Sequence, residues 1–348
     1  MKSNSILDIN TRVKDIQSAY SKINGPESIM LDITQRCNLH CKHCYNCSHS
    51  KFSDDLSDED MIEVVKQIIE VNPQSVCICG GEPTVRFDLC LKVAEMLTEN
   101  DILVNMVTNG NKSDIKSLER LYKSGINSIQ VSLDSYDPDI MNKFRESPIA
   151  YKNAVNAIYN ILSLNNMPSV TFIPTKMNYK EMPLVGEFLY DLGVNELRYM
   201  PFIAIGRGRS NIDKLKLSPE ENQELFWLLK SKSKELKGFK FDYGDPVEHI
   251  YLFRNNKEAF NPSYEIKSNG DISLTCYLPY IYGNVLKTNL KELWKNGLDN
   301  IWKVGYFHDI VSRMNTVEDF EKQKIIPYTN NDIDLYNKDL EGIYLYDN

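Results

Sequence analysis

Residues 37–45 read CNLHCKHCY and place three cysteines, Cys37, Cys41 and Cys44, in a CxxxCxxC spacing just after the apolar run 29–33. Thiolates this close together in a reducing cell favour a soft metal or an iron–sulfur cluster over disulfides. Three thiolates can bind three irons of a cubic 4Fe–4S cluster, which leaves the fourth iron open to an exogenous ligand. The stretch therefore predicts a reactive metal site and not a structural one.

A second motif, Gly80-Gly81-Glu82-Pro83, follows the apolar run 75–79. Glycine has no Cβ, so its backbone tolerates positive φ and the close approach of a ligand. The two motifs, in this order, resemble the signature of radical S-adenosylmethionine enzymes. In that family the open iron is chelated by S-adenosylmethionine. One electron from the cluster then releases a 5′-deoxyadenosyl radical, which abstracts a hydrogen atom from the substrate.

The resemblance implies several cofactor contacts. The Gly-Gly-Glu-Pro turn would bind the amino group of S-adenosylmethionine, and Tyr45 would lie beside the adenine. Asn109, Ser132 and Asp134 follow or end further apolar runs, where the family contacts the nucleoside part or the carboxylate. The resemblance also implies one 4Fe–4S cluster and an external electron donor such as flavodoxin or ferredoxin.

A structural zinc site is the alternative to the cluster. His40, His43 or His49 would complete four ligands, but the cysteine spacing followed by the Gly-Gly turn fits the usual zinc fingers poorly. Cys47 could also replace one of the three cysteines as a ligand. We interpret Cys47 instead as a free thiol near the cluster.

Composition excludes some classes of function. The 348 residues carry a net charge of −8, so there is no overall basic footprint for nucleic acid. No apolar run approaches the roughly 20 residues of a membrane span. The first residues lack the features of a signal peptide. We therefore expect a cytoplasmic protein, without nucleic-acid or membrane partners, which suits an oxygen-sensitive cluster.

Short apolar runs alternate with amphipathic stretches as far as residue 210. Six such units imply parallel strands joined by right-handed crossovers. They are too few for an eight-stranded barrel but fit the open barrel of the family. We expect an α/β fold, a partial (β/α)6 TIM-like barrel whose site lies at the carboxyl ends of the strands. The expected strands are 29–34, 75–79, 102–108, 128–133, 169–174 and 195–200, and the expected helices are 57–69, 88–99, 113–124, 150–164 and 180–192.

The pattern changes after residue 210. A helix is expected over 217–236, and residues 264–274 alternate with period two around Asn-Gly, which predicts a β-hairpin. With Cys276 after it, this order resembles the SPASM or twitch extension of the family, which uses several cysteines for auxiliary clusters. Cys276 is the only cysteine after residue 90, so we predict a reduced α+β extension without auxiliary metal. The expected division is 1–27 as an N-terminal helical segment, 28–210 as the barrel and 211–348 as the extension.

These features predict a radical enzyme that modifies a ribosomal peptide by crosslinking or epimerisation, because such extensions accompany peptide substrates in the family. The alternative is a radical enzyme that acts on a small metabolite, sugar or nucleoside. A non-catalytic iron–sulfur protein would not need the Gly-Gly-Glu-Pro turn. Cys276 is either a core residue or a hydrogen-atom donor, since a thiol S–H bond is weaker than a backbone Cα–H bond.

Overall fold

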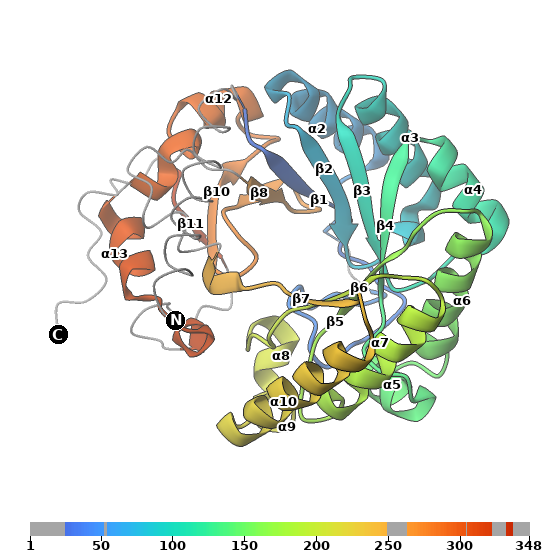
Figure 1. Cartoon of the computed structure of the whole chain (residues 1–348). Helices are drawn as coiled ribbons and strands as arrows, with labels where there is room; N and C mark the ends of the chain where they lie inside the picture. The colour runs from blue at the N-terminus through green and yellow to red at the C-terminus, as the bar shows by residue number, and fades with distance from the viewer. Residues whose placement is uncertain (1–24, 52–53, 249–262, 304, 322–331, 337–348) are drawn as a thin grey trace.

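The computed structural model describes residues 25–51, 54–248, 263–303, 305–321 and 332–336 (Figure 1). The expected N-terminal helical segment therefore lies almost entirely outside the described residues. All described strands belong to one sheet of eleven strands, in the order β11-β10-β9-β8-β1-β2-β3-β4-β5-β6-β7. The α/β fold class and the partial barrel expected from the sequence are confirmed.

The first seven strands form the parallel part of this sheet. The six expected strands are present within a few residues of their expected bounds, and β7 continues the parallel order beyond residue 210. The strands are β1 Ser28–Thr34, β2 Ser75–Gly80, β3 Leu103–Thr108, β4 Ile126–Ser132, β5 Ser169–Phe172, β6 Glu196–Tyr199 and β7 Lys240–Tyr243.

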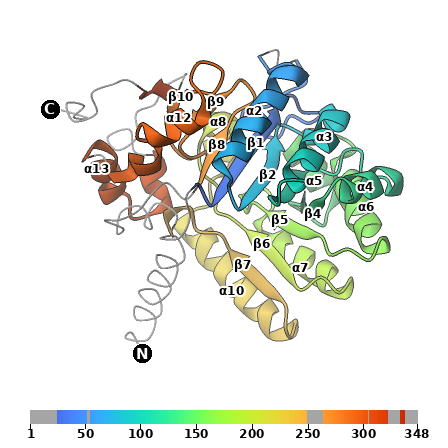
Figure 2. The ribbon, with the colours of Figure 1, turned by 90° about the horizontal axis from the view of Figure 1, so that it is seen from above.

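Helices cover the outer side of the parallel strands (Figures 1 and 2). Capping side chains set where several of them begin: Ser57 accepts a hydrogen bond from the backbone of Asp60, and Ser218 and Glu221 form a capping box. The helices are α2 Asp58–Val71, α3 Phe87–Thr98, α4 Ile115–Lys123, α5 Pro138–Arg145, α6 Ala150–Ser163, α7 Met182–Asp191, α8 Gly206–Ser210, α9 Ile212–Leu215 and α10 Pro219–Glu235, with 3₁₀ turns η1 Pro83–Arg86 and η2 Tyr179–Glu181.

The two faces of the parallel strands differ in polarity. The outer face packs on the helices and is apolar; Leu31 and Ile78, for example, are fully buried. The inner face carries polar and sulfur-containing side chains, because register places Asp32 beside Cys79 and Cys77 beside Asn105. The inside of the partial barrel is therefore suited to a polar ligand.

The C-terminal extension continues the same sheet. The expected hairpin is confirmed as β8 Ser263–Ile266 and β9 Asp271–Ser273, and β8 pairs in parallel with β1. The remaining elements are β10 Tyr280–Asn284, β11 Ile333–Asp334, α12 Leu290–Lys295, η3 Leu298–Lys303, α13 Gly305–Arg313 and η4 Val317–Glu321. Trp302 and Phe307 are fully buried among these elements.

No helix in the described part of the chain is both long enough and apolar enough to cross a membrane.

We expect Leu31→Ala to lower the free energy of unfolding by about 2–5 kcal/mol, because Leu31 is fully buried at the centre of the sheet and its truncation leaves a cavity. Leu103→Ala is the control, since Leu103 on β3 is 48% exposed. Urea unfolding followed by circular dichroism measures both variants. Equal losses would show that β1 is not the packing centre of the sheet.

Candidate functional site

The loop after β1 carries the three cysteines. Cys37 is buried, and its Sγ lies 3.4 Å from the Leu39 N–H and 3.7 Å from Asn109 Nδ2. Burial raises the pKa of the Cys37 thiol to about 12 and that of Cys41 to about 11, and the neighbouring thiols add to both shifts. Such thiols ionise only beside a cation, while the N–H groups can donate to sulfur. The donor set therefore fits a cationic iron–sulfur cluster.

Residues of and around α8 hold the cysteine loop from one side. Arg207 donates from Nη1 to the Cys41 carbonyl over 2.9 Å and from Nη2 to the Ser48 carbonyl over 2.6 Å. Gly206 has φ +52°, and a Cβ there would lie 2.0 Å from the Tyr45 carbonyl oxygen. Only glycine fits this contact, so the cysteine loop and the start of α8 pack directly against each other. No local sequence pattern indicates this role of Arg207, because its partners lie far away along the chain.

The end of α5 holds the loop from the other side. The Lys42 N–H donates to the Phe144 carbonyl over 3.1 Å, and the His43 ring stacks on Phe144 with centroids 4.3 Å apart. The buried Arg145 donates from Nε to Asp134 Oδ2 over 2.6 Å, and its Nη1 lies 4.0 Å from Cys41 Sγ. Asp134, which we expected to contact the cofactor, thus forms an ion pair with Arg145 in the structure.

The histidines do not support the zinc alternative. His40 Nδ1 lies 2.9 Å from Glu146 Oε2, and burial lowers the pKa of His43 to about 4. Among the described residues, no three Cys, His, Asp or Glu side chains are arranged to hold a single metal ion. A cubic cluster does not need that arrangement, because each thiolate binds a different iron.

The turn after β2 is hydrogen-bonded to the end of β1 and the start of the cysteine loop. Gly80 has φ +126°, and a Cβ on Gly81 would lie 2.3 Å from the Arg36 carbonyl oxygen. The Gly81 N–H donates to the Thr34 carbonyl over 2.7 Å, and the Glu82 N–H donates to Arg36 over 3.0 Å. Close packing therefore explains both glycines and leaves the turn beside the cysteines.

The Glu82 side chain fixes this turn from within. It is fully buried and accepts hydrogen bonds from the Thr84 N–H over 3.1 Å and from the Asn109 N–H over 2.8 Å. Asn109 Nδ2 in turn donates to Asn38 Oδ1 in the cysteine loop over 2.9 Å. Pro83 begins η1 directly after the turn. The ends of β1, β2 and β3 thus form one connected unit, whereas Ser132 lies half-buried at the end of β4.

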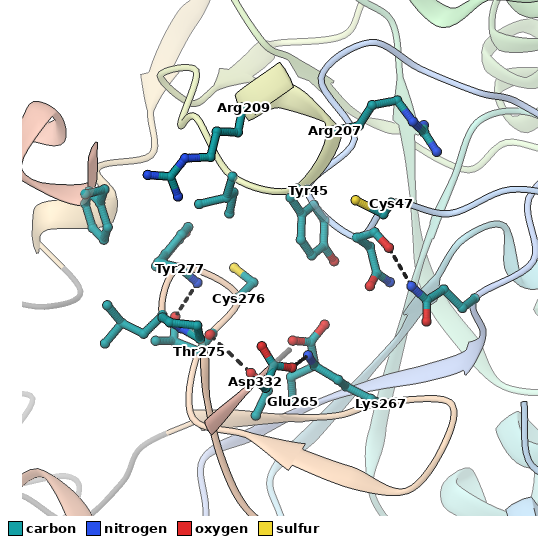
Figure 3. Close-up of a pocket in the computed structure, with 18 of the residues that line it drawn as sticks. Tyr45, Cys47, Arg207, Arg209, Glu265, Lys267, Thr275, Cys276, Tyr277 and Asp332 are labelled. Carbon is teal, nitrogen blue, oxygen red and sulfur yellow. Dashed lines mark hydrogen bonds and ion pairs between the residues drawn. The ribbon is translucent and has the colours of Figure 1, made fainter. Parts of the chain in front are cut away.

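A pocket of about 510 Å³ lies between the cysteine loop, α8 and the C-terminal hairpin (Figure 3). Tyr45 and Cys47 line it from the cysteine loop, and Cys276 and Tyr277 line it from the segment after β9. The hairpin therefore completes a chamber against the end of the cysteine loop. The lining residues are Gln35, Tyr45, Asn46, Cys47, Ile205, Gly206, Arg207, Arg209, Ser210, Glu265, Lys267, Ser273, Thr275, Cys276, Tyr277, Leu278, Pro279, Phe320 and Asp332.

Comparison with known proteins identifies the domain that carries the cysteines. Residues 31–183 match the sequence model of the Radical SAM superfamily. The chain contains a radical SAM domain. Radical SAM enzymes use a 4Fe–4S cluster and S-adenosylmethionine, and the cysteine loop with its Gly-Gly turn fits both groups. When bound, these groups supply the 5′-deoxyadenosyl radical, while the radical SAM domain supplies the thiolates, the turn and the enclosure.

Related sequences cover most of the chain. Fe-coproporphyrin III synthase of Methanosarcina barkeri (strain Fusaro / DSM 804) is 24% identical over 309 residues, which cover 81% of this chain and 76% of that protein. PqqA peptide cyclase of Granulibacter bethesdensis (strain ATCC BAA-1260 / CGDNIH1) is 25% identical over 228 residues, which cover 65% of this chain and 61% of that protein.

Solved structures show the same fold. Streptococcus suis SuiB bound to precursor peptide SuiA superposes with a TM-score of 0.65 and 18% identity, covering 86% of this chain and 71% of SuiB. SuiB bound to S-adenosylmethionine gives a TM-score of 0.62 with 17% identity, covering 86% of this chain and 72% of SuiB. This chain thus shares the fold of the matched part of SuiB.

Glu265 on β8 lines the pocket, and a second buried carboxyl group, Asp32, lies on the neighbouring strand β1. Asp32 on β1 and Glu265 on β8 are only 1% and 2% exposed. Burial, followed by the nearby Glu265, raises the pKa of Asp32 well above its usual range, and burial raises the pKa of Glu265. Asn46 Nδ2 donates to Asp32 Oδ2 over 2.8 Å. The sequence contains both acids, but no pattern indicated that they lie together.

We expect the triple variant Cys37→Ala, Cys41→Ala and Cys44→Ala to lose the cluster absorbance of anaerobically reconstituted protein, whereas the wild type should bind about four irons per chain. Cys47→Ala is the matched control, since Cys47 is an exposed cysteine next to the same loop. It should keep the full iron content. A triple variant that still bound a complete cluster would refute the ligand assignment.

We expect Asp32→Asn to stabilise the protein increasingly as pH rises. Because the pKa of Asp32 is raised on folding, the folded state binds more protons than the unfolded state above about pH 4. The free energy of unfolding of the wild type therefore falls as pH rises toward the raised pKa, by about 1.4 kcal/mol per unit of pKa difference. Asn cannot ionise and does not suffer this loss.

Urea unfolding of both proteins between pH 4 and pH 8 measures the difference. Asp114→Asn is a control of opposite sign, because hydrogen bonds from Ser117 lower the pKa of Asp114 at the start of α4. That variant should be less stable than the wild type, and the difference should change little above about pH 5, because Asp114 is then ionised in both the folded and the unfolded state. If the difference in free energy of unfolding between Asp32→Asn and the wild type did not change with pH, the raised pKa of Asp32 would be contradicted.

Proposed function

We propose that this radical SAM enzyme modifies a peptide. The observation that carries the proposal is the pocket of about 510 Å³ between the cysteine loop and the C-terminal hairpin. A radical formed at the cysteine loop would meet a substrate there, enclosed by polar and aromatic side chains that limit side reactions with water.

Two of the similar proteins support a peptide as substrate. PqqA peptide cyclase is named for a peptide, and one SuiB structure contains its precursor peptide. The match to SuiB covers 86% of this chain, so it extends beyond the barrel into the C-terminal extension. The external electron donor expected from the sequence, such as flavodoxin or ferredoxin, is part of the same proposal.

Cys276 is the proposed hydrogen-atom donor. Figure 3 shows its thiol in the pocket, on the far side of Tyr45 from Cys47. Burial, with a contribution from Glu265, raises the pKa of Cys276 far above its usual range. The group therefore stays an S–H at neutral pH, which hydrogen-atom transfer requires, because a thiolate has no hydrogen to give.

Cys276 would donate its hydrogen atom during inversion of a substrate residue at Cα. When bound, the cluster and S-adenosylmethionine would supply a 5′-deoxyadenosyl radical that removes a hydrogen atom from a substrate Cα, leaving 5′-deoxyadenosine and a Cα radical. The Cys276 S–H bond breaks and a new Cα–H bond forms on the opposite face, which inverts the residue. The remaining thiyl radical needs one electron from the external donor and one proton to restore the thiol.

A small molecule is the second candidate substrate. Fe-coproporphyrin III synthase, whose alignment covers 81% of this chain, is named for a porphyrin product. A porphyrin is larger than a peptide side chain and would have to fill the whole pocket. The two candidates differ in what they predict for Cys276, because only Cα inversion requires a donor thiol.

We expect the reduced enzyme with S-adenosylmethionine, incubated in D2O with candidate peptides encoded next to its gene, to form 5′-deoxyadenosine and to place deuterium at one Cα. Cys276→Ala should still form 5′-deoxyadenosine but lose the deuterated product, as judged by mass spectrometry. Cys47→Ala, in the same pocket, should keep it.

The outcomes separate the parts of this proposal. Unlabelled modified peptide would refute Cys276 as donor and leave the peptide function standing. Unmodified peptides together with turnover of a tetrapyrrole or nucleoside would refute the peptide function. No 5′-deoxyadenosine under any condition would refute radical catalysis.

A further inference from the structure

One oxygen of each buried carboxyl group in the Asp32–Glu265 pair lacks a hydrogen-bond donor among the described residues. Register places Glu265 on β8 beside Met30 on β1, two residues from Asp32. Asp32 Oδ1 and Glu265 Oε1 are both buried, and neither has a hydrogen-bond donor among the described residues. A buried carboxylate without a donor is costly, so these oxygens are suited to a partner from outside the protein.

The charged groups around the pair do not neutralise it. Lys267, directly after β8, forms an ion pair with Asp332, and its charge lowers the pKa of Glu265 and of Asp32 without outweighing burial. The other titratable groups that face the pair are Tyr45, Cys276, Cys79 and Cys77. Burial contributes to raising the pKa of the first three, and a hydrogen bond with Cys79 lowers the pKa of Cys77. None of these four groups is a cation. In the described part of the chain around Glu265, three carboxyl groups, Asp32, Glu265 and Asp332, therefore share the single cation Lys267.

The aromatic walls of the pocket are suited to the methylene groups of a cationic side chain. Tyr45, Tyr277 and Phe320 line the pocket. The rings of Tyr277 and Phe320 pack edge to face, with their centroids 5.5 Å apart. Aromatic faces attract cations and pack on methylene groups. Figure 3 shows Arg207 and Arg209 on the side of the pocket opposite Glu265, so a positive group is favoured beside Glu265 and disfavoured at that rim.

We propose that Glu265, backed by Asp32, binds the ammonium or guanidinium group of a basic side chain of the substrate. This inference rests on the proposed peptide function, because a peptide supplies such a side chain together with a backbone for the rest of the pocket. Glu265 would thereby be a specificity-determining residue: it selects which residue enters the pocket and sets how that residue lies relative to Cys276.

Binding of the cation is coupled to a proton. The two carboxyl groups lie on paired strands and the charge of Glu265 raises the pKa of Asp32, so we expect them to hold one proton between them when no cation is bound. A bound ammonium group replaces that proton, and the pair ionises against it. Binding should therefore release protons and become tighter as pH rises. An uncharged side chain would bind without this coupling.

The test uses the reconstituted holoprotein with S-adenosylmethionine and two probes of nearly equal shape, N-acetyl-L-lysine N-methylamide and N-acetyl-L-norleucine N-methylamide. Calorimetric titration should show the lysine amide binding at least about tenfold more tightly, the ratio expected for one charge-assisted hydrogen bond. Titrations in two buffers of different ionisation enthalpy should reveal proton release with the lysine amide alone.

Glu265→Gln should remove both the preference and the proton release. Thr275→Val is the matched control, because Thr275 lines the same pocket without charge. If Glu265→Gln does not fold, the pH dependence of the wild type decides: affinity for the lysine amide should rise between pH 5 and pH 8, while affinity for the norleucine amide stays level.

Equal affinity for the two amides, or no binding of the lysine amide, would overturn the proposal. These results leave the peptide function intact, because that function is tested by 5′-deoxyadenosine and modified peptide. A modified peptide with no basic residue next to the altered position would also overturn the cation site while confirming the peptide function.

Discussion

The pairing of β1 with β2 on one side and with β8 on the other determines where every part of the site lies. β1 ends at the cysteine loop, and β2 ends at the Gly-Gly turn that hydrogen-bonds back to that loop. β8 brings the C-terminal hairpin against the same strand. A shift of one residue in either register would turn Asp32 or Glu265 into the apolar outer layer, so the polar interior depends on this alignment.

Local patterns were sufficient for most of the fold. The six strands with period-two or apolar runs, the helices with capping signals and the Asn-Gly hairpin lie where the sequence indicates, because each of these signals acts within a few residues. α5 was missed because its eight residues are too few to show a helical period. β7 was missed because its four residues mix charged and aromatic side chains on an edge strand.

The site was only partly predictable for a related reason. The cysteines and the Gly-Gly turn are contiguous motifs. By contrast, Arg207 reaches back to Cys41, Arg145 reaches Asp134 and Cys41, and Glu265 meets Asp32 across more than two hundred residues. A buried acid within a strand has the same pattern as a solvent-exposed one. Only the tertiary register shows that both carboxyl groups face inward.

The acid pair and Cys276 constrain each other electrostatically. An unpaired cation beside Cys276 would stabilise the thiolate and remove the hydrogen that the proposed donor must give. A cation bound to Glu265 instead forms a neutral pair, and the negative charge of Glu265 already raises the pKa of Cys276. The same carboxylate can therefore select a basic side chain and keep the neighbouring thiol protonated, which explains why a costly buried acid would lie next to the donor.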